Sequence, residues 1–182
     1  MSRTICITLT IATVLTACQT APEPQRTDAA NQCAPFALDT AGWQLVERSS
    51  FTFRVPPDFR EAAVQGIDSD VAQFEASDGS AFVSTDLGWY SNDLSHDASV
   101  YEQYESCTTT IGGKPAVVVT GTLRERTESG AARYVAAAAW RDIQARRDDS
   151  DMPVHLTMWG EVQDRTRFQD VLTVLHTVRF RN

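Results

Sequence analysis

Lysine is almost absent from this chain of 182 residues. Of its 16 basic side chains only Lys114 is a lysine, and they face 24 acidic side chains, for a formal net charge of −8. Binding to nucleic acid needs clustered Lys and Arg against phosphates, and anionic membrane surfaces attract polybasic runs. The composition therefore argues against nucleic acid as a partner and predicts one acidic domain.

The sequence also lacks the motifs that identify common active sites. It contains no HExxH, no CxxC and no Gly-x-Ser-x-Gly elbow, so no zinc enzyme, thiol redox enzyme or serine hydrolase is indicated. The histidines His96, His155 and His176 are scattered along the chain, and we interpret the last two as structural. The sequence predicts no catalytic residue, no metal ligand and no cofactor.

Two short motifs have simple structural interpretations. Gly112-Gly113-Lys114 lacks the remainder of a phosphate-binding loop and predicts a hairpin turn. Asp148-Asp149-Ser150-Asp151 offers carboxylates of the kind that calcium prefers, but it lacks the Gly and the distal Glu of an EF-hand loop. Because Arg146 and Arg147 adjoin it, we interpret this segment as a solvated loop.

No apolar run is long enough for a membrane-spanning helix, which needs about 20 residues. The chain instead begins with Arg3, a short apolar stretch and small residues at 16–17, which is the pattern of a secretory signal peptide. The segment Leu15-Thr16-Ala17-Cys18 resembles the lipobox of bacterial lipoproteins. That resemblance implies diacylglyceryl transfer to the Cys18 thiol, cleavage before Cys18 and N-acylation, with Gln19 favouring the outer membrane. The alternative is an ordinary signal peptide in which Cys18 is incidental.

The rest of the chain divides into a tether and a domain. Residues 19–35 have few large apolar side chains and contain Pro22, Pro24 and Pro35, a composition that cannot offset the entropy lost on ordering. We therefore predict a lipoprotein signal peptide over 1–17, a lipidated N-terminus with a flexible tether over 18–41, and a folded domain over 42–182.

Cys33 and Cys107 remain after the signal peptide and the lipid site are set aside. An exported domain with one remaining pair of cysteines suggests a disulfide. Cys107 lies three residues after Tyr104 on the apolar face of the helix predicted below, so such a bond would attach the end of the tether to that helix. Two free, buried thiols are the alternative.

Alternating and β-branched runs predict a sheet of antiparallel strands joined by hairpins. The alanine-rich segment 134–140 is interpreted as a strand, although the helix propensity of alanine makes a helix the alternative. Two amphipathic helices are expected, one containing Leu94, Ala98, Tyr101 and Tyr104 and one containing Phe168, Val171, Leu172 and Leu175. The predicted strands cover 43–46, 51–55, 71–75, 81–85, 108–111, 116–120, 134–140, 154–159 and 176–180.

These elements give an α+β fold class, an antiparallel β-sheet with flanking helices. The order Phe51-x-Phe53-x-x-Pro56, a Gly66-Ile67-Asp68-Ser69 turn before a hairpin, and a terminal helix that leads into Thr177-Val178-Arg179-Phe180 resembles PsbP-like domains. The resemblance covers roughly residues 42–181. It implies an α/β/α sandwich and a non-catalytic role, and it carries no active-site residues to this chain.

A candidate ligand patch consists of Asp68, Asp86, Trp89 and Tyr90. Acidic groups and consecutive aromatic side chains at the ends of elements are typical of a site for a small ligand or a peptide. A turn with edge aromatics that cap the sheet is the alternative explanation of the same residues.

The sequence thus predicts a protein anchored by lipid in the cell envelope, on the periplasmic side of the outer membrane. Its membrane contact is the lipid anchor, and its envelope partner or small ligand is not identified by any motif. We expect a binding or assembly module rather than an enzyme. The alternative is an envelope hydrolase or other enzyme whose site is assembled from distant residues.

Overall fold

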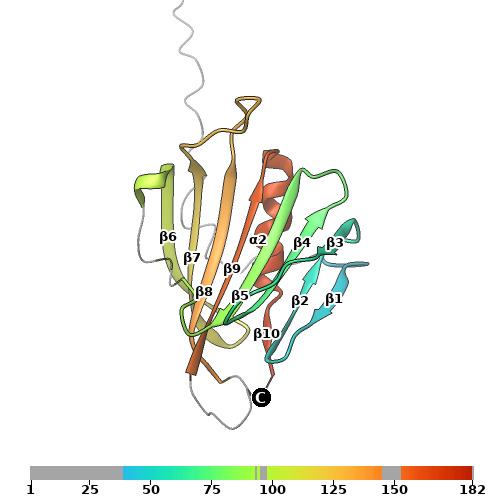
Figure 1. Ribbon diagram of the computed structural model, residues 1–182, viewed down its shortest axis with the longest axis vertical. Coiled ribbons are helices and arrows are strands. Elements are labelled where there is room, and N and C mark those ends of the chain that lie inside the picture. The colour runs from blue at the N-terminus through green and yellow to red at the C-terminus, as the bar shows by residue number, and fades with distance from the viewer. Residues whose placement is uncertain (1–38, 93, 95–97, 145–152, 182) are drawn as a thin grey trace, which may run out of the picture.

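The computed structural model describes residues 39–92, 94, 98–144 and 153–181. Most of these residues lie in β-strands, and the chain runs through them largely by hairpins (Figure 1). In chain order the elements are β1 (Gln44–Glu47), β2 (Phe51–Val55), β3 (Phe59–Ala62), β4 (Asp70–Ala76), β5 (Ala81–Gly88), the 3-10 turn η1 (Ala98–Val100), β6 (Tyr101–Ile111), β7 (Lys114–Leu123), β8 (Tyr134–Gln144), β9 (Pro153–Val162), the 3-10 turn η2 (Arg165–Arg167), α2 (Phe168–His176) and β10 (Arg179–Phe180).

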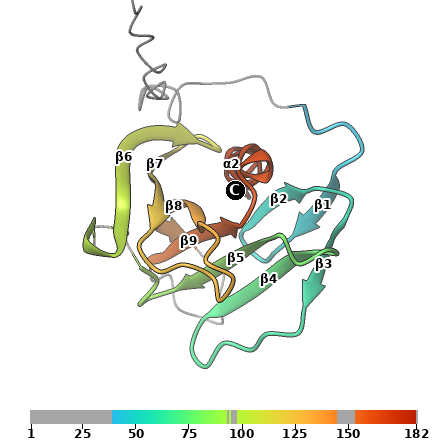
Figure 2. The same ribbon diagram turned by 90° about the horizontal axis from the view of Figure 1, so that it is seen from above.

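The strands form two antiparallel sheets. The larger has seven strands in the order β3-β4-β5-β9-β8-β7-β6, and the smaller has three in the order β1-β2-β10. Viewed from above, the larger sheet curls around α2, and the smaller sheet lies on the far side of the helix (Figure 2). We call the face of the larger sheet toward α2 the concave face and the opposite face the convex face.

The helix α2 forms because its apolar side chains recur at helical spacing. Val171, Leu172, Val174 and Leu175 are all buried, and the helix contacts β8 and β9 on one side and β2 on the other. Each such side chain contributes about 1.5–3 kcal/mol of apolar burial. The helix thus joins the two sheets into one hydrophobic core.

Aromatic rings connect the sheets directly. Phe51 and Phe53 are inward-facing residues of β2, and the Phe53 ring meets Phe74 of β4 edge to face, with 5.5 Å between centroids. Thr177 fastens the end of α2 to the same strand, because its hydroxyl accepts a hydrogen bond from the Arg54 backbone N–H at 2.8 Å. The small sheet is therefore part of the core.

Most of the predicted strands are confirmed. The alanine-rich segment lies within β8, and the predicted turn at 112–113 joins β6 to β7. A hairpin also joins the predicted strands 71–75 and 81–85, as β4 and β5. Ala136 and Ala138 face the core and Ala137 and Ala139 face the convex side, so alternation overrides the helix propensity of alanine. The short strand β3 was not predicted.

The predicted helix around Leu94 to Tyr104 is wrong. Ala98–Val100 form only η1, and Tyr101 and Tyr104 belong to the strand β6. The register of β6 against β7 extends from Tyr101 to Ile111, and the ladder hydrogen bonds, together with the β-branched threonines of this segment, favour the strand. Cys107 therefore lies on a strand, and its expected place on the apolar face of a helix is wrong.

The expected layers are also corrected. The antiparallel sheet and the terminal helix are present, but α2 is the single α-helix of the described residues and covers one face. The α/β/α sandwich with flanking helices that the PsbP-like resemblance implies is not found. The closing strand is shorter than predicted, because His176 is the last residue of α2 and only Arg179 and Phe180 pair with β2.

The signal peptide, Cys18, Cys33, His96 and the segment 148–151 lie outside the described residues. Across the described ranges, no helix has both the length and the apolar composition needed to span a bilayer.

Candidate functional site

The concave face changes character along its length. Beneath α2 it presents Ala116, Val118, Ala138 and Met158, all buried. Toward the end where η2 begins, the same face of β7 presents Thr120 and Thr122 instead. Because the side chains of a strand alternate between faces, the core-facing side of β7 passes from apolar to hydroxyl groups within a few residues.

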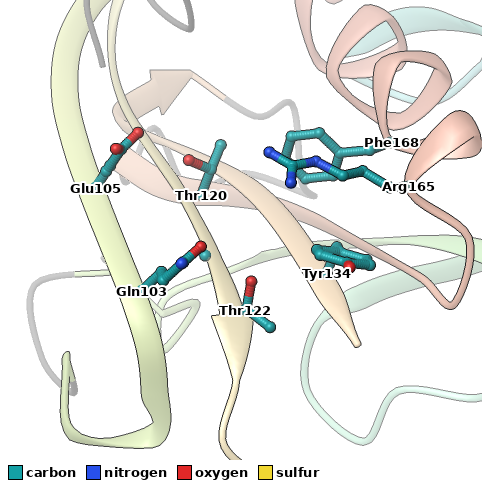
Figure 3. A pocket seen from close by; sticks show the side chains of 8 residues that line it. Gln103, Glu105, Thr120, Thr122, Tyr134, Arg165 and Phe168 are labelled. Atoms are coloured by element: carbon teal, nitrogen blue, oxygen red, sulfur yellow. The ribbon is translucent and has the colours of Figure 1, made fainter. Parts of the chain in front are cut away.

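A small pocket opens at this polar end (Figure 3). Its volume is about 70 Å³, roughly the space that two water molecules occupy in the liquid. The wall on the sheet side comes from β6, β7 and β8, and the opposite wall comes from η2 and the start of α2. The lining residues are Gln103, Glu105, Thr120, Gly121, Thr122, Tyr134, Arg165 and Phe168.

Arg165 supplies the positive charge of the pocket. Its guanidinium projects from η2 across the opening toward β7 (Figure 3) and lies 5.8 Å from the centroid of the Tyr134 ring. That ring also meets Phe168 edge to face, with centroids 6.5 Å apart. A cation stacked on an aromatic ring is held in place without a carboxylate, and Arg165 has no ion-pair partner among the described residues.

A cap fixes the turn that carries Arg165. The Asp164 carboxylate accepts a hydrogen bond from the Thr166 backbone N–H at 2.9 Å. This backbone hydrogen bond, with smaller help from the Thr166 side chain, lowers the pKa of Asp164. Because the carboxylate stays ionised, its hydrogen bond to the Thr166 N–H stabilises the 3-10 turn η2. This turn holds Arg165 in its orientation toward the sheet.

The opposite wall offers hydrogen-bonding groups. Thr120 and Thr122 are buried, Glu105 is half-buried and Gln103 is exposed. Hydroxyl and amide groups on one wall and a guanidinium over the Tyr134 ring on the other suit the anionic end of a polar ligand, while the Glu105 carboxylate can accept a hydrogen bond only from a hydroxyl or N–H group of that ligand. The small volume admits the end group and leaves the rest of the ligand outside.

The predicted ligand patch lies elsewhere. The pairing of Asp70 with Leu87 brings the 68–70 turn beside the end of β5, so the two halves of the patch are neighbours. Asp68 is exposed, and Trp89 and Tyr90 have 46% and 86% of their surface exposed. Asp86 is half-buried on the convex face, where it lines a separate cavity with residues of β8 and β9.

The histidines and the cysteine within the described residues are not brought into the pocket. His155 lies on the convex face opposite Gly88, and His176 ends α2. Cys107 is half-buried on β6 against the core, and Cys33, its predicted partner, lies outside the described residues. Nowhere in the described ranges do three or more His, Cys, Asp or Glu side chains gather closely enough to hold a metal ion.

Sequence reasoning missed all the residues of the pocket. One signal was present: the alternate positions Ala116, Val118, Thr120 and Thr122 place two hydroxyls on a face that begins apolar. A change of polarity on the core-facing side of a buried strand marks the place where the face meets solvent or a ligand. Arg165 has no comparable signal, because its position depends on how η2 packs against β8.

No protein-family model matches this chain, and a search of curated proteins finds none with significant similarity.

Proposed function

We propose that this chain is a lipid-anchored protein of the cell envelope and that its domain binds, without catalysis, an envelope component that presents an anionic group. The lipobox-like Leu15-Thr16-Ala17-Cys18 supports the anchor, and Gln19 supports the outer membrane facing the periplasm. The pocket of Figure 3 supplies the binding chemistry.

One observation carries the binding proposal. The Arg165 guanidinium is stacked on Tyr134, has no acidic partner among the described residues, and faces the buried hydroxyl residues Thr120 and Thr122 across the pocket. A carboxylate placed there gains a charge-assisted hydrogen bond from Arg165 and neutral hydrogen bonds from the threonines. The rings of Tyr134 and Phe168 add a surface on which the flat face of a sugar can pack.

The envelope contains a carboxylate of this kind. N-acetylmuramic acid, a peptidoglycan sugar, differs from N-acetylglucosamine by a lactyl group, which ends in a free carboxylate wherever no stem peptide is attached to it. The lactyl carboxylate is small enough for a pocket of about 70 Å³, while the sugar ring lies outside it. A pair of ligands that differ in this one group therefore tests the proposal directly.

The experiment measures binding of N-acetylmuramic acid and N-acetylglucosamine to the mature chain by NMR titration. We expect the acid to bind at least fivefold more tightly. Arg165→Gln should weaken its binding at least tenfold, because a hydrogen bond to a charged group contributes about 1.5–3 kcal/mol. Arg60→Gln is the matched control, since Arg60 is exposed on β3 and donates only to the nearby carbonyls of Pro57 and Phe59. Equal affinity for the two sugars, or unchanged binding in Arg165→Gln, would contradict the proposal.

A further inference from the structure

The convex face holds a second cavity, of about 230 Å³. It lies across the middle of the sheet from the core, so it shares no volume with the pocket that contains Arg165. Its lining residues come from β5, β6, β8 and β9 and from the segment that follows β5: Asp86, Asn92, Leu94, Tyr101, Val135, Ala137, Thr157 and Trp159.

Small side chains create the hollow. Val135 and Ala137 of β8 form part of its lining, and Trp159, which pairs with Ala137 in the register, stands beside them. The Tyr101 ring lies against Gly121, and a Cβ atom added to Gly121 would come within 2.5 Å of the Tyr101 Cδ1 atom. Trp159 is held by an edge-to-face contact with Phe82, 4.8 Å between centroids. The cavity is thus lined by two aromatic rings over small residues.

Asp86 brings a carboxylate to this cavity. It pairs with Thr157 across β5 and β9, and it has no ion-pair partner among the described residues. Its Oδ1 atom is shielded from solvent and accepts no hydrogen bond. Burying an ionised carboxylate without compensation is costly, so the carboxylate favours the arrival of a positive charge.

The neighbouring polar groups do not compensate this charge. The Ser91 hydroxyl donates to either the Asp86 backbone oxygen, at 2.9 Å, or the Thr157 hydroxyl, at 2.7 Å. The Thr157 hydroxyl in turn donates to the Asn92 backbone oxygen. These hydroxyl groups donate to one another and to the backbone, and none of them donates to the carboxylate of Asp86, which has no partner among the described residues.

We propose that this cavity binds a small organic ammonium ion. The carboxylate of Asp86 pairs with the ammonium group, and the rings of Tyr101 and Trp159 attract the cation and pack against its alkyl part. The net charge of −8 on the chain raises the local concentration of cations. A neutral molecule of the same shape loses the ion pair, and an anion is repelled.

Butylammonium and 1-butanol are the probes, because they have the same chain length and differ in charge. The experiment follows the indole N–H of Trp159 by NMR while each probe is added to the mature chain. We expect millimolar affinity for butylammonium and at least tenfold weaker binding of 1-butanol. Asp86→Asn should lower the affinity for butylammonium about tenfold, whereas Arg165→Gln in the other pocket should leave it unchanged.

Glu75→Gln is the matched control, because Glu75 is an exposed acid on the convex face of β4 and lies outside the cavity. Ala137→Leu is a second test that keeps every charge and fills the hollow, and it should abolish binding even if Asp86→Asn folds poorly. Equal binding of the two probes, or unchanged binding in both Asp86→Asn and Ala137→Leu, would overturn the proposal.

An ammonium group occurs both in free amines and in lipid headgroups, and two further binding experiments distinguish these two sources. Free ethanolamine that binds with the affinity of butylammonium indicates a soluble amine. Binding to phosphatidylethanolamine vesicles, but not to phosphatidylglycerol vesicles, that is lost in Asp86→Asn indicates the headgroup. Failure of N-acetylmuramic acid to bind at Arg165 would not affect any of these results.

Discussion

Val171 of α2 lies directly over Gly160 of β9. A Cβ atom on Gly160 would come within 2.5 Å of the Val171 Cγ1 atom and within 2.8 Å of the Phe82 backbone oxygen. The helix therefore approaches the sheet to a distance that only a glycine allows. This contact sets how deeply α2 enters the concave face, and so where η2 and Arg165 stand.

Gly160→Ala should destabilise the domain by about 1–3 kcal/mol, because the added methyl group overpacks the contact between α2 and β9. Urea unfolding followed by circular dichroism measures the change. The double variant Gly160→Ala with Val171→Ala should lose less stability than the sum of the two single losses, since the methyl group of Val171 that meets the new Cβ is removed. A double variant whose loss equals the sum of the two single losses would contradict this explanation.

Glu161→Gln should lower the free energy of unfolding by about 2 kcal/mol, the scale of a hydrogen bond to a charged group. Glu161 is buried, and its two carboxylate oxygens accept from Arg133 Nε at 2.5 Å and Nη2 at 2.7 Å. Glu125→Gln is the matched control, because Glu125 also pairs with Arg133, at 3.2 Å, but its side chain is 82% exposed. The control should change the unfolding free energy by less than about 0.5 kcal/mol. Equal losses of stability in Glu161→Gln and Glu125→Gln would contradict the expectation that the buried ion pair contributes more than the exposed one.

Acid should weaken the fold through Asp78 and Asp164. Hydrogen bonds from Ser80 and from Thr166 lower the pKa values of these two carboxyls below the ordinary 3.8. Their contribution is fully present above that value and is lost as the pH falls through the folded-state pKa. Urea titrations from about pH 6 down to pH 2.5 should show a smaller loss of stability in Asp164→Asn than in the parent chain.

At Asp170 the pKa shift, and therefore its effect on stability in acid, has the opposite sign to that at Asp78 and Asp164. Burial raises the pKa of its carboxyl, with a smaller opposing effect from Arg167. In the folded state Asp170 therefore binds its proton more readily, and it offsets part of the acid-induced loss. Asp170→Asn should make the loss of stability below about pH 4 steeper than in the parent chain. A shallower loss would show that the ion pair with Arg167 outweighs burial.

Cys33 and Cys107 should form a disulfide in the exported chain. The mass of the intact protein should then rise by two hydrogen masses on reduction. Cys33→Ser should lower the free energy of unfolding by about 4 kcal/mol in the chain-entropy model, and reduction of the parent chain should give the same loss. An unchanged mass on reduction would indicate the two free thiols instead.

Cys18→Ala should move the protein from the membrane fraction to the soluble periplasmic fraction, because two or more acyl chains are needed for stable anchoring. Fractionation followed by immunoblotting measures the change. Thr20→Ala is the control, since it lies beyond the lipobox-like segment and alters neither the cleavage site nor the thiol. Retention of Cys18→Ala in the membrane fraction would contradict the prediction that Cys18 carries a lipid anchor.

The sequence predicted the parts of the fold that depend on local pattern. Strict alternation in Phe51–Val55 and helical spacing in Phe168–His176 both gave the right element, because one face of each is buried. It failed at Tyr101 and Tyr104, whose spacing also fits a helix. Their partner strand β7 begins after the turn at 112–113, and pairing with it decides the structure of that segment.

The candidate sites depend on contacts that no local pattern contains. Arg165 and Thr120 are 45 positions apart in the sequence and meet because α2 follows β9 back across the concave face. Asp86 was singled out from the sequence, but with Trp89 and Tyr90 as its neighbours. In the structure Trp159 supplies the indole beside it, since β9 pairs with β5.

The elements that close the core follow, in the chain, the strands of the larger sheet. α2 and β10 occupy residues 168–180, and they supply the side chains that fill the concave face and complete the smaller sheet. A chain that emerges N-terminus first has made the strands of the larger sheet before it makes residues 168–180, so the apolar side of that sheet stays uncovered until this segment arrives. Burial of the core therefore depends on a segment that follows the strands it covers, and a chain that lacked α2 would leave the concave face exposed.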